Sequence, residues 1–323
     1  MTEPDVAIVV LNYNGRDLLE TYLPSIFDLD YDNYRVIVVD NASTDDSVPF
    51  LREHYPDVEI VEKAENVGIA SGYNAGAEAA PDADYCWFMN NDVRVTPDSL
   101  SLLVDRLESA PDVAIAFPRI NDMGSETIQS LGMDIDLFGY RGWPELGKGQ
   151  TEPPFTEPRE IAQGKGCAML VDRAVWREIG GFDDGNFLYG DDSYLCLQSW
   201  VRGYHVETVP DSVVYHEEDV TIGKNPLKPY HLARSKTRTY LKTFQLSTLL
   251  VGFPGFLFLF FGQLGKDVLA RGRLRLPAYR LAGFLAALAT LPDIYAHRKE
   301  LREVREYDDS EFLTPASETW DIP

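Results

Sequence analysis

Residues 87–93, WFMNNDV, end an apolar run with three side chains that carry oxygen, Asn90, Asn91 and Asp92. Divalent cations such as Mg²⁺ and Mn²⁺ take oxygen ligands in proteins, typically one or two carboxylates together with phosphate oxygens. The stretch therefore predicts a site for a cation that carries a nucleotide diphosphate, with Asp92 as the carboxylate ligand. An Asx-rich turn that caps the helix expected near Pro97 explains the same residues, and the stretch alone does not decide between the two.

Two adjacent carboxylates, Asp191 and Asp192, follow a glycine-rich aromatic loop and precede an apolar helical pattern. Helix capping needs only one of them. Two like charges side by side raise the pKa of at least one, which suits a general base. His216 follows an apolar run at residues 213–215, and its imidazole is a candidate ligand for the same cation, whereas a structural role is the usual one for a single His.

Asp40 ends a second apolar run, RVIVVD. A carboxylate at this place commonly contacts the ribose or base of a nucleotide, but the dinucleotide version also requires G-x-G-x-x-G after the first strand. The corresponding turn here is NYNGRDL, with a single glycine, which argues against a dinucleotide-binding fold. Capping of the loop that follows is the structural alternative for Asp40.

These polar clusters need a scaffold that brings strand ends together. Apolar runs of strand length alternate with helical patterns, and we expect strands at residues 6–11, 35–39, 58–61, 85–89 and 113–117. Such alternation is typical of an α/β fold with a mostly parallel sheet covered on both faces. Ligands of these sheets bind beyond the carboxyl ends of the strands, where the polar clusters lie. Residues 118–163 lack regular periodicity and are expected to form a long excursion.

Seven segments in this order resemble the family 2 glycosyltransferases, and most of all their rhamnosyltransferase-like branch. They span roughly residues 6–220 and read VVLNYNG, VVDNASTDDS, ENVGIASGYNAG, FMNNDV, GKGCAMLV, GGFDDGNFLYGDD and VVYHE. Each segment is a weak signal alone, but seven in order are specific. The resemblance implies a GT-A fold, which is the Rossmann-like fold of nucleotide-diphospho-sugar transferases.

The resemblance also implies roles for individual residues. The implied nucleotide-sugar-binding residues are Asn12, Asn14, Asp40, Asn66, Gly68, Asn74, Asn90 and Asn91. Asp92 occupies the last position of the family's D-x-D motif and His216 matches the histidine after the last strand, so both are implied ligands of Mg²⁺ or Mn²⁺. Asp192 matches the catalytic base, with Asp191 beside it.

The implied reaction is an inverting transfer, in which Asp192 deprotonates an acceptor hydroxyl that attacks the anomeric carbon. The acceptor is expected to be a glycan, linked to a lipid, in cell-surface polysaccharide or protein glycosylation. Three departures weaken the match, namely Asn90 in place of Asp, Asp191 in place of Glu, and Tyr194 and Gln198 in place of a charged pair. The alternative is a catalytically silent nucleotide-sugar-binding scaffold subunit in a membrane glycan-assembly complex. Asn90, Tyr194 and Gln198 support it, whereas the retained Asp92, Asp192 and His216 argue against it.

Charge divides the chain into three parts. The net charge is −28 for residues 1–223, +11 for 224–305 and −6 for 306–323, and it sums to −23. We interpret these parts as a catalytic domain, a basic and apolar helical membrane-associated region, and a disordered acidic tail. The overall charge disfavours nucleic acid as a partner. It also predicts a salt-loving cytoplasm, such as that of a halophilic archaeon, because screening by salt removes the self-repulsion.

Residues 243–265 carry no charge, and as a helix they would extend about 34 Å, enough for a bilayer core. Pro254 is expected to kink or break this helix, and the next apolar run, residues 281–292, is too short to span a bilayer alone. Basic residues flank the first run, at 234, 236, 238 and 242 before it and at 266, 271, 273 and 275 after it. Since basic residues mark the cytoplasmic side, a re-entrant or interfacial hairpin is favoured over a single crossing. A soluble helical cap or a dimer interface is the alternative.

Cys86, Cys167 and Cys196 are widely spaced in apolar runs, so we expect free thiols and no disulfide framework. The first fifteen residues lack the pattern of a secretion signal. We therefore expect the chain at the cytoplasmic face of the cell membrane, in contact with membrane lipid.

Overall fold

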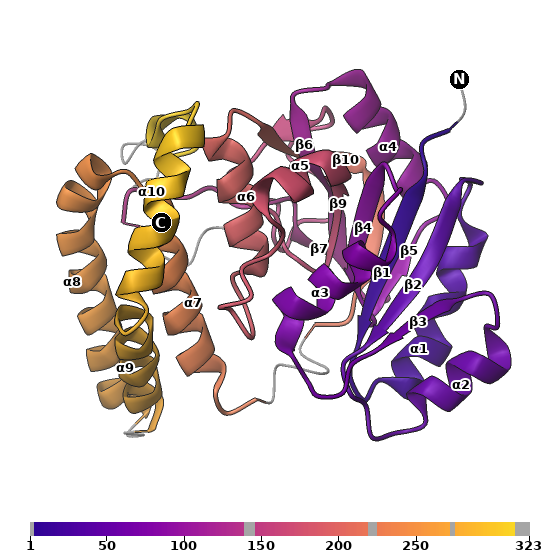
Figure 1. The fold of residues 1–323 in the computed structure, drawn as a ribbon, viewed down its shortest axis with the longest axis horizontal. Helices are drawn as coiled ribbons and strands as arrows, with labels where there is room; N and C mark the ends of the chain where they lie inside the picture. The colour runs from indigo at the N-terminus through magenta and orange to yellow at the C-terminus, as the bar shows by residue number, and fades with distance from the viewer. Residues whose placement is uncertain (1–2, 139–145, 219–224, 272–274, 314–323) are drawn as a thin grey trace.

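A computed structural model of the chain describes residues 3–138, 146–218, 225–271 and 275–313 (Figure 1). The strands are β1 (Val6–Asn12), β2 (Tyr34–Asp40), β3 (Glu59–Glu62), β4 (Tyr85–Asn90), β5 (Val93–Val95), β6 (Val113–Asp122), β7 (Ile128–Ser130), β8 (Arg159–Glu160), β9 (Ala168–Asp172) and β10 (His205–His216). The α-helices are α1 (Arg16–Tyr22), α2 (Ser47–His54), α3 (Gly68–Ala79), α4 (Ser99–Ser109), α5 (Arg173–Ile179), α6 (Asp191–Val201), α7 (Lys228–Thr243), α8 (Leu246–Arg271), α9 (Arg275–Leu288) and α10 (Leu291–Val304). Short 3₁₀ helices lie at Leu23–Asp28 and Asp309–Glu311.

One sheet organises the first two thirds of the chain. Its strand order is β3-β2-β1-β4-β9-β6-β10-β5, with β7 on β6 and β8 on β10. The expected parallel arrangement holds for β3-β2-β1-β4. The sheet becomes mixed beyond them because β9 lies antiparallel between β4 and β6, and β5 is antiparallel to β10. The apolar run before His216 belongs to a longer strand, β10, which has an irregularity between Val209 and Val213.

Successive residues of β1 point into two different hydrophobic clusters. Val6 and Ile8 contact the cluster that also contains residues of α1, α2 and α4, whereas Ala7 and Val9 contact the cluster that contains residues of α3, α5 and α6. Both faces of the sheet are therefore covered, as continuous apolar strands require. The helix α3 packs close to β1, since a Cβ on Gly76 would lie 2.2 Å from a methyl carbon of Val9.

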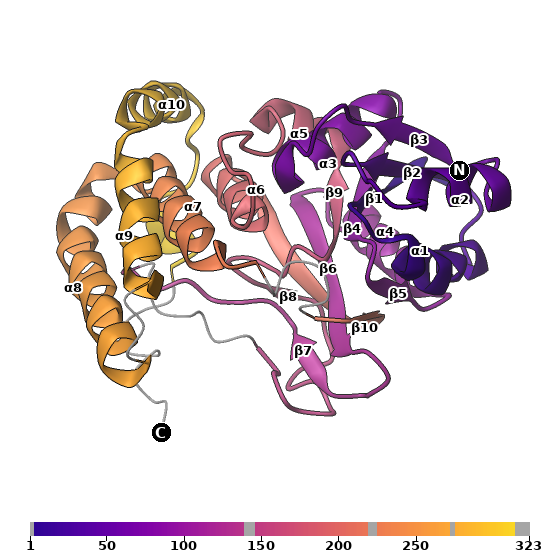
Figure 2. The same ribbon diagram turned by 90° about the horizontal axis from the view of Figure 1, so that it is seen from below.

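The C-terminal helices share one hydrophobic cluster with the sheet. The cluster of the strand residues also contains Tyr240 of α7, Phe244 just after α7, Phe256 and Phe260 of α8, and Phe284 of α9. The helix α7 packs against α6 and α9, and α8 lies at the outer edge of the molecule (Figures 1 and 2). The expected boundary near residue 223 falls outside the described residues.

Two expectations for this region need correction. A break at Pro254, one of the two expected effects, does not occur, because α8 continues through this residue. Its inner face is packed on the protein through Phe256 and Phe260, both with no exposed surface. Arg238 and Lys242, which were counted from the sequence among the basic residues that flank the apolar run, are not available to a membrane surface. Both side chains are buried, and they form ion pairs with Asp183 from the loop before α6.

The first part of the acidic tail is also ordered. The backbone N–H of Glu306 donates to the carbonyl of Val201 at 2.8 Å. The ring of Phe312 is buried and lies between Trp200 and Phe244. The expected disorder therefore does not extend to residues 306–313, and the rest of the tail lies outside the described residues.

Candidate active site

The polar ends of three neighbouring strands contact one another. The register of β1 on β2 pairs Asn12 with Asp40, and the Asn12 amide donates to the Asp40 carboxylate at 3.0 Å. The amide of Asn91, just after β4, donates to the Asn12 side-chain oxygen at 2.7 Å. The structure thus brings these three predicted residues together at the carboxyl edge of the sheet.

The side chains of Asp40 and Asn14 accept hydrogen bonds from the backbone of the loop that follows β2. Asp40 is 3% exposed, and its second carboxylate oxygen accepts from the backbone N–H of Ser43 at 2.9 Å. The side-chain oxygen of Asn14 accepts from the backbone N–H of Thr44 at 2.7 Å. Both residues hold the loop after β2, which is the capping role left open for Asp40.

A cavity of about 430 Å³ lies beside these strand ends, a size typical of small-molecule sites. The predicted residues that line it are Asn66, Gly68, Asn90, Asn91, Asp92, Asp191, Asp192 and His216. Four predicted residues, Asn12, Asn14, Asp40 and Asn74, do not line it. We call this cavity the donor pocket, after the nucleotide-diphospho-sugar donor that the sequence resemblance implies.

One wall of the donor pocket is shaped by the start of α3. The side-chain oxygen of Asn66 accepts from the backbone N–H of Gly68 at 3.0 Å. Gly68 has φ +84°, and a Cβ there would lie 2.3 Å from the carbonyl oxygen of Phe187, so only glycine fits. Asn74 joins α3 to the loop before α6, because its side chain bonds both the N–H and the carbonyl of Phe182.

Asp92 and His216 lie together at the other side of the pocket. The strand β5 begins just after Asp92 and pairs antiparallel with β10, so that Val93 lies opposite His216. Asp92 Oδ1 is 3.4 Å from His216 Nε2. This oxygen is buried and has no hydrogen-bond partner, which is costly unless a cation binds there.

The imidazole of His216 is oriented by Gln129. Lys165 Nζ donates to Gln129 Oε1 at 3.0 Å, and the Gln129 amide nitrogen donates to the His216 carbonyl at 2.8 Å. Gln129 Oε1 therefore faces His216 Nδ1, at 3.0 Å, as the acceptor of an N–H. The Nε2 lone pair of His216 is then directed at the Asp92 carboxylate. In metal sites a hydrogen bond to the other ring nitrogen commonly fixes the ligating histidine in this way, and Gln129 makes that bond here.

The donor set fits a divalent cation. Two protein ligands that leave the remaining positions to phosphate oxygens suit Mg²⁺ or Mn²⁺. Within the part of the chain that the structure describes, no group of three or more His, Cys, Asp or Glu side chains could hold a metal ion. Asp92 and His216 would therefore need the donor's phosphates to complete the coordination.

Asp191 and Asp192 begin α6 after two residues with positive φ, Tyr189 and Gly190. Asp192 accepts from the backbone N–H of Gly166 at 3.0 Å. Burial raises the pKa of both carboxyl groups, and with the charge of Asp192 it raises the pKa of Asp191 to about 8. The hydrogen bonds to Asp192 lower its pKa against burial, so Asp192 ionises first. The pair can hold one proton while Asp192 accepts another.

Tyr194 and Gln198, the residues that replace the expected charged pair, do not line the donor pocket. The Gln198 amide donates to the hydroxyl of Thr243 at 3.3 Å. The Tyr194 ring lies 5.8 Å from the ring of His297 on α10. These two substitutions thus serve the contact of α6 with the C-terminal helices.

Several polar residues of the site were not predicted from the sequence. Among them are Gln129, which orients His216, and Lys165, Tyr189 and Lys228, which line the donor pocket. Lys165 could have been identified from the sequence, since it lies between two glycines and is one of few basic residues before position 224. No sequence pattern indicates Gln129, because it lies in the aperiodic excursion of residues 118–163.

The mixed sheet, with a pocket beside the ends of its parallel strands, agrees with the GT-A fold that the sequence predicts. Residues 7–180, more than half of the chain, match the family described as Glycosyl transferase family 2. The chain belongs to this family, and the GT-A fold inferred from the sequence is confirmed.

Three similar proteins illustrate this placement. The chain is 27% identical over 254 residues to the N-acetylglucosaminyl-diphospho-decaprenol L-rhamnosyltransferase of Mycobacterium tuberculosis, covering 72% of this chain and 82% of the relative. The solved mannosyltransferase PcManGT of Pyrobaculum calidifontis, in complex with GDP-Man and Mn²⁺, is similar with TM-score 0.56 and 20% identity over 94% of this chain and 86% of that one. S. aureus TarS 1–349 in complex with UDP-GlcNAc is similar with TM-score 0.61 and 13% identity over 94% and 93%.

Proposed function

We propose that this protein is an inverting, divalent-metal-dependent glycosyltransferase of the rhamnosyltransferase-like branch. It moves a sugar from a nucleotide-diphosphate donor to a hydroxyl of a lipid-linked glycan, in the assembly of cell-surface polysaccharide or protein-linked glycans. The observation that carries the proposal is that one pocket is lined by both the Asp92–His216 pair and the Asp191–Asp192 pair.

The two pairs divide the chemistry between them. Asp92 and His216 would hold the cation, which neutralises charge on the diphosphate leaving group when bound. Asp192 takes the proton of the acceptor hydroxyl as its oxygen forms a bond to the anomeric carbon. The bond from that carbon to the diphosphate oxygen breaks, and its electron pair leaves with the diphosphate. One displacement of this kind inverts the configuration and leaves no sugar on the enzyme.

Two relatives support the choice of substrates. The Mycobacterium tuberculosis relative is named for N-acetylglucosaminyl-diphospho-decaprenol, a sugar carried on a lipid diphosphate. The Pyrobaculum calidifontis structure contains a nucleotide sugar with Mn²⁺. A hydroxyl acceptor is also consistent with the retained carboxylate pair, because an acceptor that is already ionised needs little base.

A donor panel tests the proposal. Purified full-length protein is incubated with nucleotide sugars and Mn²⁺ or Mg²⁺, with and without a lipid-linked acceptor, and the anomeric configuration of the product is read by NMR. We expect cation-dependent consumption of one donor and an inverted product. Binding of a nucleotide sugar without turnover on any acceptor would instead favour the silent scaffold subunit.

We also propose that α8 holds the protein on the cytoplasmic face of the membrane. Leu246–Leu269 is long and apolar enough to cross a bilayer by length and composition. Its inner face packs on the protein, whereas Leu250 is 71% and Phe258 77% exposed. Because only one face is available to lipid, the helix is expected to lie in the membrane interface rather than to span it. Lys266 and Arg275 are exposed near one end, where anionic headgroups attract them.

Flotation on liposomes that contain anionic lipid tests this placement. Phe258→Asp should reduce binding, because it puts a charge on the exposed face of α8. Phe27→Asp, at a 44% exposed position on the catalytic part, is the matched control. A full-length chain that is monomeric and soluble without detergent and does not float would instead identify α8 as a packed helical cap.

The acidic surface supports a further proposal, that the protein works in a salt-rich cytoplasm. Screening by molar KCl removes repulsion within the catalytic part, whose net charge is −28 over residues 1–223. Thermal unfolding should therefore move to higher temperature as KCl rises. A fall in the unfolding temperature with KCl would contradict this proposal.

A further inference from the structure

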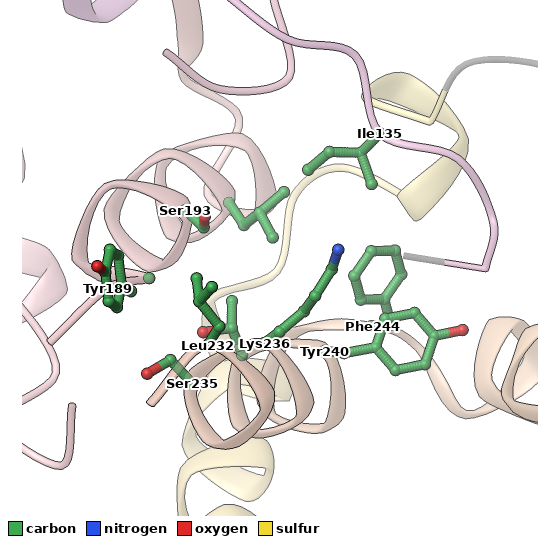
Figure 3. Close-up of a pocket in the computed structure, with 11 residues that line it drawn as sticks. Ile135, Tyr189, Ser193, Leu232, Ser235, Lys236, Tyr240 and Phe244 are labelled. Carbon is green, nitrogen blue, oxygen red and sulfur yellow. The ribbon is translucent and has the colours of Figure 1, made fainter. Parts of the chain in front are cut away.

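A second cavity adjoins the donor pocket. It has a volume of about 190 Å³ and lies between α6 and α7 (Figure 3). Four residues, Tyr189, Gly190, Ser193 and Leu232, line both cavities. Since Ser193 is next to Asp192 in α6, the second cavity begins beside the catalytic carboxylates. We call it the α6–α7 cavity.

Most of the lining of the α6–α7 cavity is apolar. Ile135, Leu197, Tyr240 and Phe244 form its walls away from the donor pocket. Engineered apolar cavities of about 150 Å³ stay dry and bind small hydrocarbons. A space of this size and character suits a segment of hydrocarbon chain and does not suit a free sugar or nucleotide.

Lys236 and Thr239 are polar residues in this mostly apolar lining. Lys236 points from α7 into the cavity (Figure 3), and burial lowers its pKa to about 8 although the charge of Asp136 opposes this effect. Thr239 is 4% exposed, and its hydroxyl has no hydrogen-bond partner. A buried hydroxyl without a partner is costly, and here it lies one helical turn from a cationic side chain. An anionic, oxygen-bearing ligand would contact both.

The far wall of the cavity is continuous with α8. The ring of Tyr240 stacks on Phe256 at 5.1 Å and on Phe253 at 6.5 Å. From the donor pocket outward, a ligand would therefore meet first the Asp191–Asp192 pair, then Lys236 and Thr239, and then an apolar wall. This wall packs on α8, the helix proposed to contact lipid. A lipid-linked acceptor has the same order: a sugar hydroxyl, a phosphate and a hydrocarbon chain.

We propose that the α6–α7 cavity binds the phosphate and the first part of the hydrocarbon chain of the acceptor, with Lys236 and Thr239 at the phosphate and Ile135, Leu197, Tyr240 and Phe244 around the chain. This inference rests on the proposed function, because it assigns the acceptor of that reaction to a second cavity. It places the acceptor's hydroxyl at the shared wall of the two cavities, within reach of Asp192.

Photolabelling of the unaltered full-length protein is the first test. The probe is farnesyl diphosphate with a diazirine on its chain, used in chelator so that the Asp92–His216 pair does not hold its diphosphate. We expect labelled peptides from residues 232–244 or from the segment around Ile135, and loss of label with excess unlabelled farnesyl diphosphate. Label confined to the exposed face of α8, or label that does not saturate, would overturn the proposal.

A charge-removing variant is the second test. Lys236→Met keeps the apolar stem of the side chain, and Lys299→Met makes the same change at an exposed position on α10. Dissociation constants are measured in chelator for farnesyl diphosphate, farnesol and inorganic diphosphate. We expect Lys236→Met to weaken farnesyl diphosphate by about 10- to 100-fold, as loss of one hydrogen bond to a charged group does, and to leave farnesol unchanged. Equal affinity of both variants for farnesyl diphosphate would refute the role of Lys236.

The outcomes separate this inference from the proposed function. If nucleotide sugars are consumed with a lipid-linked acceptor but the probe does not label the cavity, the cavity assignment fails and the transferase stands. If the probe labels the cavity but no donor is consumed with any acceptor, the cavity is a prenyl-phosphate site and the proposed reaction fails.

Discussion

Asp183 is a buried carboxylate that joins the loop before α6 to the C-terminal helices through ion pairs with α7. Its carboxylate accepts from Arg238 Nε at 3.0 Å, from Arg238 Nη2 at 3.1 Å and from Lys242 Nζ at 3.1 Å. All three side chains are at most 7% exposed. Burial alone would raise the pKa of Asp183, but the bonds and charges of Arg238 and Lys242 outweigh it and lower the pKa.

Asp183→Asn removes this negative charge with little change of shape. Two buried cations then share one carboxylate, Asp293, whose side chain is 56% exposed. Breaking a buried pair by removing one partner costs about 3–5 kcal/mol. An unfolding entropy of about 2.1 cal/mol/K per residue for 323 residues converts this into a fall of about 4–7 °C in Tm.

Differential scanning calorimetry at neutral pH measures the change. Asp184→Asn is the matched control, because Asp184 is exposed and accepts from neutral donors, Ser71 and Asn74; it should cost about 1 kcal/mol or less. Adding Arg238→Met to Asp183→Asn should restore part of the lost Tm, since it removes one unpaired cation. A Tm for Asp183→Asn equal to that of Asp184→Asn would refute the reasoning. The difference in Tm between the wild type and Asp183→Asn should become smaller below the unfolded pKa of Asp. The reason is that a carboxyl group with a lowered folded pKa loses its contribution to stability as the pH falls through that folded pKa.

Three further predictions concern the site. Asp192→Asn should lower turnover by about 10²–10⁴-fold while nucleotide-sugar binding is kept; near-normal turnover would remove Asp192 from its role. Gln129→Leu should weaken Mn²⁺-dependent binding of the nucleotide sugar by about 10- to 100-fold, as measured by titration calorimetry. Gln150→Leu, at an exposed position, is the control, and an unchanged affinity of Gln129→Leu would mean that Gln129 does not orient His216. Because the folded pKa of Asp191 is raised to about 8, the wild type should lose stability as pH rises from about 4 through 8. Asp191→Asn should make this slope smaller in urea unfolding without divalent cation, and the buried Asp192 should account for the rest; parallel pH curves would contradict the raised pKa of Asp191.

The sequence allowed prediction of much of the sheet and of the residues around the pocket, for a physical reason. Apolar runs identify strands buried on both faces, and the ends of parallel strands meet at one edge. That rule is enough to bring Asn12, Asp40 and Asn91 into contact. It does not tell whether a side chain at that edge faces the cavity or the neighbouring loop. Asp40 and Asn14 face the loop because the N–H groups of Ser43 and Thr44 need acceptors.

Long-range partners could not be predicted in the same way. Gln129 has no periodic context, and its importance follows only from the position of His216, 87 residues away in the chain. The antiparallel insertion of β9 between β4 and β6 likewise has no local signature, because a short apolar run fits either direction.

The change from an acidic to a basic composition near residue 224 was visible in the sequence. The sequence did not show which acidic residue pairs with the basic side chains beyond that point. Basic residues before an apolar helix are typical of a membrane flank, and the composition alone favours that interpretation. In the structure Arg238 and Lys242 instead pair with Asp183, in the loop that precedes Asp191 and Asp192. Because buried pairs are screened much less than exposed ones, this contact persists in salt that would weaken attraction to anionic lipid. We therefore expect the acidic N-terminal part and the basic helices to stay together at high salt, and the membrane attachment proposed above would then depend on the exposed apolar face of α8.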